Sequence, residues 1–182
     1  MLGLGQNLSS SKFVKTYPVF TYESDFSSTV DSFTAHSATT KGTVSRVATA
    51  EGESDLLKIA FAGTEPTPWY VERVIDSTLS DQQDEGSVYT ISFDIFIDDA
   101  DDSNTAGTVG IRAFAGLLNM VTGTQLISQT INTNEWTTLK TSGALAKVGG
   151  DNLILGQGSG DMPTNLDNVY VKNIKFTFEQ RA

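Results

Sequence analysis

The chain has 182 residues, a formal net charge of −10 at pH 7 and no cysteine. Its acidity argues against a nucleic-acid partner, because an acidic surface repels phosphate backbones. Without cysteine there is neither a disulfide framework nor thiol chemistry. The length fits a single domain, and no apolar run in the sequence approaches the roughly 18 residues that a membrane-spanning helix needs.

The N-terminal segment differs in composition from the rest of the chain. Its leucines are separated by glycine and polar residues, so the segment cannot bury them against itself. The apolar stretch is too short for an export signal, and Lys12 follows it rather than preceding it. We therefore expect an arm over residues 1–16, made without a signal peptide, and one domain over residues 17–182. The arm residues that would dock on a partner are Leu2, Gly3, Leu4, Gly5 and Leu8.

Short segments rich in β-branched and aromatic residues recur through the domain, with Gly, Asn, Asp and Ser between them. This spacing is typical of strands joined by turns, and no segment keeps a helical period over ten residues or more. The sequence therefore predicts an all-β protein, an antiparallel two-sheet β-sandwich. In chain order the expected strands are 43–48, 55–61, 69–75, 89–98, 108–115, 126–132, 136–141, 152–158 and 169–178, with a further short strand within 27–37.

The segment 89–98 shows the clearest alternation of apolar and polar residues. Its odd-numbered positions from Tyr89 to Ile97 are apolar, and its even-numbered positions are polar except for Phe96. Such a pattern indicates a strand with one face on a core and the other in water. The run 98–107 is too polar for a strand, so we expect a hairpin loop that returns the chain as the partner strand 108–115.

The residue types that catalysis needs are sparse in this sequence. The single histidine, His36, lies in a polar run and is interpreted as a surface residue. One histidine and no cysteine cannot supply a zinc site. Glu72 and Asp94 would form a pair of carboxylates if they shared a sheet face, but nothing in the sequence sets their separation. We therefore predict that the protein is not an enzyme.

The acidic run 98–107 has part of the spacing of a calcium-binding loop. Asp99, Asp101 and Ser103 have the spacing of the first three ligands of such a loop. However, Asn104 stands where the loop requires glycine, and Gly110 stands where a bidentate glutamate should be. We therefore interpret the run as a solvated loop and predict neither a metal nor another cofactor.

Aromatic residues follow two prolines in the segment EPTPWY. Trp69 and Tyr70 at the start of a strand could stack on the apolar C–H face of a sugar ring. The alternative is that they are core or edge aromatics of the sandwich. Trp136 is interpreted as a core residue.

Five segments, PWYVERVI, SVYTISFDIFID, EWTTLKTSG, DNLILG and VYVKNIKF, occur in this order. With them the chain resembles the carbohydrate-binding modules found beside xylanases and glucanases, over roughly residues 20–178. The resemblance implies a jelly-roll sandwich whose ligand-facing sheet carries Trp69. At the position where that family has a glutamine, this chain has Glu72.

The last strand departs from the family at a calcium position. Where the family has a calcium-binding aspartate, the matching residue here is Lys172, and an ammonium group cannot ligate Ca²⁺. Aligning Asp167 with the family's aspartate instead leaves the FTF segment that follows unmatched. The resemblance therefore predicts no calcium at this site.

The arm carries a second resemblance, to the N-terminal arms of small structural proteins of tailed bacteriophages. This resemblance implies a virion structural protein, such as a capsid decoration, head fibre or tail component, made in the host cytoplasm. Its arm would attach it to other capsid or tail proteins, and homo-oligomer formation is left open. A frayed terminus is the other interpretation of the arm.

The alternative function is a carbohydrate-binding module that binds a polysaccharide on one sheet face. The glycan face would comprise Trp69, Tyr70, Glu72 and Arg112. Arg112 is assigned by alternation, since its neighbours Ile111 and Ala113 would face inward.

Overall fold

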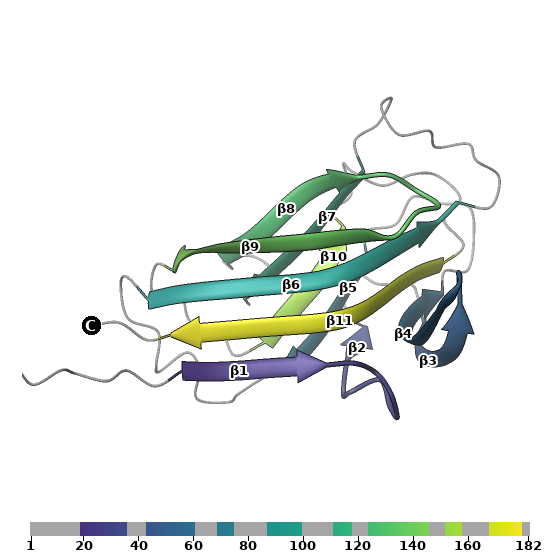
Figure 1. Ribbon diagram of the computed structural model, residues 1–182, viewed down its shortest axis with the longest axis horizontal. Helices are drawn as coiled ribbons and strands as arrows, with labels where there is room; N and C mark the ends of the chain where they lie inside the picture. Colours follow the sequence, from purple (N-terminus) through teal and green to yellow (C-terminus); the bar gives the residue numbers. More distant parts are fainter. Residues whose placement is uncertain are drawn as a thin grey trace, which may run out of the picture.

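The computed structural model describes residues 19–35, 43–60, 69–74, 87–99, 111–117, 124–145, 152–157 and 168–179. The regular elements within these ranges are all strands, arranged as two antiparallel sheets (Figure 1). The predicted all-β, two-sheet sandwich is therefore confirmed. The strands are β1 Val19–Ser24, β2 Thr34–Ala35, β3 Thr43–Ala50, β4 Glu53–Ala60, β5 Trp69–Val74, β6 Ser87–Asp98, β7 Ile111–Leu117, β8 Thr124–Ile131, β9 Thr137–Leu145, β10 Asn152–Gln157 and β11 Asn168–Glu179.

The six-stranded sheet, named sheet A here, has the order β3-β4-β11-β6-β9, and β1 also pairs with β11. The strands β4 and β1 share one edge of β11 end to end, because β4 pairs with residues 168–171 and β1 with residues 174–179. The five-stranded sheet, sheet B, has the order β2-β5-β10-β7-β8. In Figure 1 the long strands of sheet A lie in front of sheet B.

Most of the expected strands are present, and two predictions need correction. The segment 89–98 was expected to form a hairpin with 108–115, but β6 belongs to sheet A and β7 to sheet B. The chain between them therefore crosses from one sheet to the other instead of turning back beside β6. The strand β1, which pairs with β11 over its whole length, was not among the expected strands. The predicted arm, residues 1–16, lies outside the described residues.

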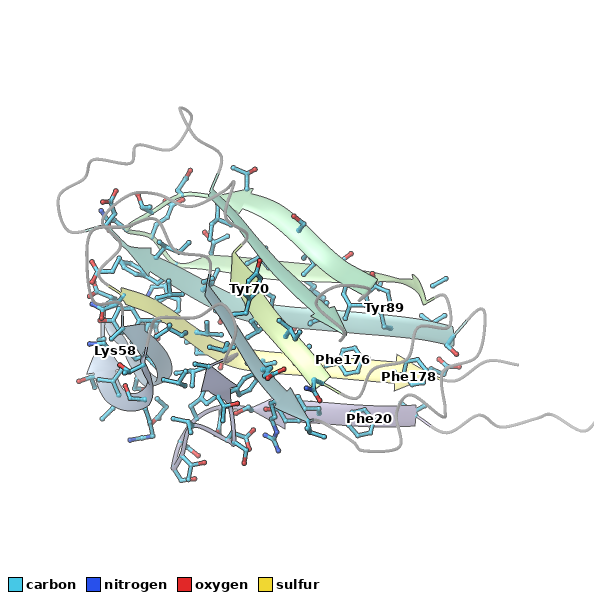
Figure 2. All side chains as sticks on the ribbon, turned by 180° about the vertical axis from the view of Figure 1, so that it is seen from behind. Phe20, Lys58, Tyr70, Tyr89, Phe176 and Phe178 are labelled. Carbon is cyan, nitrogen blue, oxygen red and sulfur yellow. The ribbon has the colours of Figure 1, made fainter. Side chains whose placement is uncertain are left out.

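The main core lies between the two sheets, and its residues follow the strand alternation. The odd-numbered residues of β6 from Tyr89 to Ile97 are buried in it, as their alternation with polar residues predicts. Figure 2 shows Phe20, Tyr89, Phe176 and Phe178 gathered toward one end of the sandwich. Each fully buried side chain of this kind contributes about 1.5–3 kcal/mol.

A β-bulge in β11 keeps apolar residues facing this core along the whole strand. One extra residue lies between Lys172 and Lys175 relative to β6, and Asn173 there has a φ of 53°. The bulge shifts the inward positions from odd-numbered residues such as Val171 to even-numbered residues such as Phe176. Without it, Ile174, Phe176 and Phe178 would face solvent.

A second, smaller cluster covers part of the outer face of sheet A. Its buried members are Leu56, Phe96 and Tyr170, and Val47, Ala50 and Trp136 pack against them. The β3–β4 hairpin reaches this face: Leu57 faces the main core while Leu56 faces the small cluster. This explains why Phe96 breaks the alternation of β6. Trp136, which was expected in the core, instead lies half-buried in this outer cluster.

Lys172 stabilises the same cluster through charge. Its Nζ lies 2.7 Å from Oε2 of Glu53 and 4.8 Å from the centre of the Trp136 ring. The Trp136 indole N–H donates to the carbonyl oxygen of Glu51 at 3.1 Å, which ties the turn of the β3–β4 hairpin to the cluster. Lys172 occupies the position of the family's calcium-binding aspartate, and there it forms a cation–π contact and an ion pair.

Candidate functional site

The outer face of sheet B brings predicted ligand-binding residues together. On β5, Val71 points into the main core and is fully buried, so Tyr70 and Glu72 lie on the opposite, outer face. Both side chains are half-buried rather than fully exposed. Figure 2, which views the molecule from behind, shows Tyr70 near the middle of the molecule.

Neighbouring strands place polar residues beside Glu72. The amide of Asn152, on β10, donates to Oε2 of Glu72 at 3.1 Å. Thr34, on β2, pairs directly with Glu72 across the sheet and is exposed. Since one carboxylate oxygen is held by Asn152, the carboxylate has a defined orientation and keeps acceptor capacity for a ligand hydroxyl.

The centre of the same face contains glycine at two adjoining positions. Gly156, on β10, pairs with Tyr70 on one side and with Phe114 of β7 on the other. Gly116 pairs with Ile154, the next outward position of β10. A glycine inside a strand often marks a place where a ligand or another backbone approaches closely.

Burial differs between the centre and the edge of this face. Ile154 is only 3% exposed although it lies on the outer side of the sheet, and Gly156 is also buried. Val74, near the end of β5, is 55% exposed. The face therefore combines a sheltered centre with half-buried polar and aromatic groups on β5 and exposed positions at its edge.

The four residues predicted for a glycan face have different positions. Tyr70 and Glu72 share the outer face of sheet B. Trp69 is the first residue of β5 and pairs with Gln157. By alternation, position 69 belongs to the same face of the sheet as Val71 and not to the face of Glu72. Arg112, on β7, pairs with the exposed Thr130. The side chains of Trp69 and Arg112 lie outside the described part of the chain, so their roles stay predictions.

Sequence reasoning missed Asn152 and Thr34 as parts of this site. Asn152 follows an aspartate at the start of a strand, and nothing local to it indicates contact with a residue 80 positions earlier. Thr34 lies in a strand of only two residues. Their positions depend on the pairing of β2 and β10 with β5, which local patterns do not report.

The two carboxylates considered as a catalytic pair are far apart in the fold. Glu72 lies on the outer face of sheet B, whereas Asp94 lies on the outer face of sheet A. Asp94 accepts hydrogen bonds from Thr138 at 2.6 Å and from Asn173 at 2.7 Å. Asp94 and Glu72 therefore do not share a sheet face, and that interpretation is wrong.

The described ranges contain neither a cluster of metal ligands nor a helix that could span a membrane. No group of three or more His, Asp or Glu side chains within them could hold a metal ion. Of the candidate calcium loop, Asp99 is described and is 1% exposed, while Asp101, Ser103 and Asn104 lie outside the described residues. The same ranges contain no helix long and apolar enough to cross a bilayer.

No family model matches the chain, and no curated protein matches it in sequence. Solved structures do resemble its fold. A xylan-binding domain of carbohydrate-binding family 22 superposes with a TM-score of 0.58 at 14% identity, over 88% of this chain and 96% of that domain. The C-terminal family 22 module of Clostridium thermocellum Xyn10B gives a TM-score of 0.57 at 14% identity, over 85% of this chain and 91% of that one.

A third similar structure is the second family 22 xylan-binding domain of Paenibacillus barcinonensis Xyn10C. It superposes with a TM-score of 0.54 at 16% identity, over 86% of this chain and 98% of that domain. These structures give no support to a virion role, which stays a prediction. They show that this chain has the β-sandwich fold of carbohydrate-binding modules.

Proposed function

We propose that this chain is a non-catalytic module that binds a neutral polysaccharide on the outer face of sheet B. The observation that carries the proposal is the placement of Tyr70 beside Glu72, whose carboxylate is oriented by Asn152. An aromatic ring packs well against the C–H face of a sugar. A carboxylate one row away accepts hydrogen bonds from the hydroxyl groups of the same sugar unit.

The electrostatics favour a neutral ligand. The chain has a net charge of −10, so a polysaccharide rich in carboxylate or sulfate groups would be repelled. The fold supports the same class of ligand, because the similar structures include domains described as xylan-binding. Xylan is therefore the first polysaccharide to test.

The proposal is tested by affinity electrophoresis in gels containing soluble xylan and by calorimetry with xylohexaose. Tyr70→Ala should weaken binding at least tenfold, and Glu72→Gln should weaken it about tenfold, equivalent to roughly 1.4 kcal/mol. The matched control is Ser142→Ala, an exposed position on the outer face of sheet A. It should bind as the unmodified protein does.

The unfolding temperature of each variant shows whether a loss of binding follows from a loss of structure. If the unmodified protein retards in no gel across xylan, mannan and glucan, the proposed function is wrong. Binding that survives Tyr70→Ala and Glu72→Gln unchanged would place the ligand elsewhere on the molecule.

A further inference from the structure

A hollow lies at the open edge of the sandwich, away from the outer face of sheet B. Its volume is about 460 Å³, within the range of about 300–1,000 Å³ that is typical of small-ligand pockets. It is formed by the end of β1, the loop that joins β1 to β2 and the bulge of β11, next to the β3–β4 hairpin (Figure 1). Its lining consists of residues 23–29, Asp31 and residues 173–175.

Two arginines from other strands hold the β1–β2 loop in place. Arg46 of β3 donates to the carbonyl oxygens of Phe26 at 2.6 Å and Ser27 at 2.8 Å, and it forms an ion pair with Asp55. These contacts join residues about 20 positions apart in the sequence. The loop is therefore anchored to the hairpin by long-range bonds.

The second arginine, Arg73 of β5, anchors the other end of the loop. Its Nη1 donates to the Tyr22 hydroxyl at 2.9 Å and forms an ion pair with Asp31. The Tyr22 hydroxyl in turn donates to Oδ2 of Asp31 at 2.6 Å. Burial and this hydrogen bond to Asp31 raise the pKa of Tyr22, so the hydroxyl stays a donor at neutral pH.

Backbone strain concentrates around the same hollow. Seven non-glycine residues in the described ranges have positive φ, and three of them, Phe26 at 53°, Asp31 at 49° and Asn173 at 53°, line the hollow. Two more residues with positive φ are connected to it: Ser32 follows Asp31 in the loop, and Asp55 forms an ion pair with Arg46. Such conformations persist where the surroundings hold them, and they cluster at binding sites.

The chemistry of the lining separates the ligand classes. Phe26 and Ile174 line the hollow but are buried in the main core, whereas the side chains of Ser27, Ser28 and Thr29 are exposed around it. The surface offered to a ligand is therefore made of hydroxyl, amide and carboxylate groups, which match the hydroxyl groups of a sugar.

Charged ligands fit the hollow less well. Of the three carboxylates that line it, Glu23 pairs with Lys175 and Asp31 pairs with Arg73, and Asp25 adds a further negative charge, so an anion would be repelled. A metal ion is also disfavoured, because no set of three acidic or histidine side chains in the described ranges is arranged to hold one. The hydrogen bond from the Ser27 backbone N–H to Oδ1 of Asp25, at 2.9 Å, lowers the pKa of Asp25. This carboxylate is therefore ionised and oriented at neutral pH.

We propose that this hollow is a second saccharide site, which binds one neutral sugar residue such as a side-chain or terminal unit of a polysaccharide. It shares no residue with the outer face of sheet B. It rests on the proposed function only for the chemical class of its ligand, and an independent measurement can test each site.

The test is a ¹⁵N-¹H NMR titration of the full chain with xylose, arabinose, mannose and galactose, followed by xylohexaose. At least one monosaccharide should shift the amides of Ser27, Ser28, Thr29 and Asn173 with millimolar saturation. Asp25→Asn should weaken that binding at least fivefold, because the amide keeps the turn to Ser27 but loses the negative charge. The matched control is Glu135→Gln, an exposed carboxylate that also accepts a local hydrogen bond, from Asn132; it should leave the titration unchanged.

The outcomes for the two sites can be distinguished. If no sugar moves the loop amides while xylohexaose moves those of Tyr70 and Glu72, the hollow proposal is overturned and the proposed function stands. If the loop amides move and those on β5 do not, the hollow proposal stands and the proposed binding face on sheet B is wrong. A loop that responds to Ca²⁺ or to a lysine-rich peptide but to no sugar would also overturn this inference.

Discussion

The outer faces of the two sheets differ in the residues that they carry and in what covers those residues. On sheet A, the β3–β4 hairpin covers Phe96 and Tyr170, and the rest of the face carries mostly polar and charged residues. One row runs across four strands as Thr21, Thr177, Thr90 and Ser142. Sheet B instead has a sheltered centre of Ile154 and Gly156 beside half-buried Tyr70 and Glu72.

This difference shows how similar alternation can serve two purposes. On sheet A the aromatic outward residues Phe96 and Tyr170 pack against the β3–β4 hairpin and Trp136, so they stabilise the fold. On sheet B the outward residues include an aromatic ring and an oriented carboxylate whose remaining acceptor capacity is available to a ligand. We therefore expect substitutions on the first face to change stability and those on the second to change binding.

The largest effect is expected from Phe96→Ala in the covered part of sheet A. Phe96 is 7% exposed, and its ring centre lies 5.5 Å from that of Trp136 and 6.3 Å from that of Tyr170. Its removal should lower the free energy of unfolding by about 3–5 kcal/mol, measured by urea denaturation. Ser92→Ala, two outward positions away on the same strand, should change it by less than about 0.5 kcal/mol. A loss below about 1 kcal/mol for Phe96→Ala would mean that the hairpin does not depend on this cluster.

A smaller effect is expected from Lys172→Gln, which removes charge from the same cluster. The variant loses the ion pair with Glu53 and the cation–π contact with Trp136, together about 1–2 kcal/mol of stability. Added salt should shrink the difference from the unmodified protein. The exposed Lys140→Gln on β9 serves as the control. Equal stability of the two variants would show that the ion pair and the cation–π contact together contribute nothing.

The smallest effect is expected from Asn152→Ala on sheet B, and it should appear in binding rather than in stability. Without the hydrogen bond from Asn152 the Glu72 carboxylate is free to rotate, so affinity for xylohexaose should fall about three- to fivefold, roughly 1 kcal/mol. Calorimetry measures the affinity, and thermal unfolding should show little change. Asn132→Ala, which removes another amide that pairs with a glutamate, is the control. A loss of stability with unchanged affinity would mean that Asn152 stabilises the fold and does not orient Glu72 for a ligand.

The bulge in β11 illustrates what the sequence alone could predict. The segment VYVKNIKFTF changes the parity of its apolar residues between Val171 and Ile174, so one extra residue at Lys172–Asn173 follows from local pattern. The strand itself was correctly predicted. Its pairing with β4 and β1 along one edge was not predicted, because that pairing depends on segments more than a hundred residues away.

The expected hairpin between β6 and β7 shows the opposite case. Two amphipathic strands joined by a polar run are compatible with a turn within one sheet and with a crossing between two sheets. Which of these forms depends on what covers each face. Similarly, the motif around Trp69 lies on the strand that carries Tyr70 and Glu72, but by alternation these two share one sheet face and position 69 belongs to the face of Val71.

The sequence by itself determined that the protein is all-β, where most strands lie and which residues of each strand face a core. These features follow from alternation, which is local to each strand. Only the tertiary structure decided which strands are neighbours, and therefore that Asn152 orients Glu72 and that Arg46 and Arg73 hold the β1–β2 loop. The physical reason is that these bonds join residues far apart in the chain, whose approach depends on the packing of both sheets rather than on any local pattern.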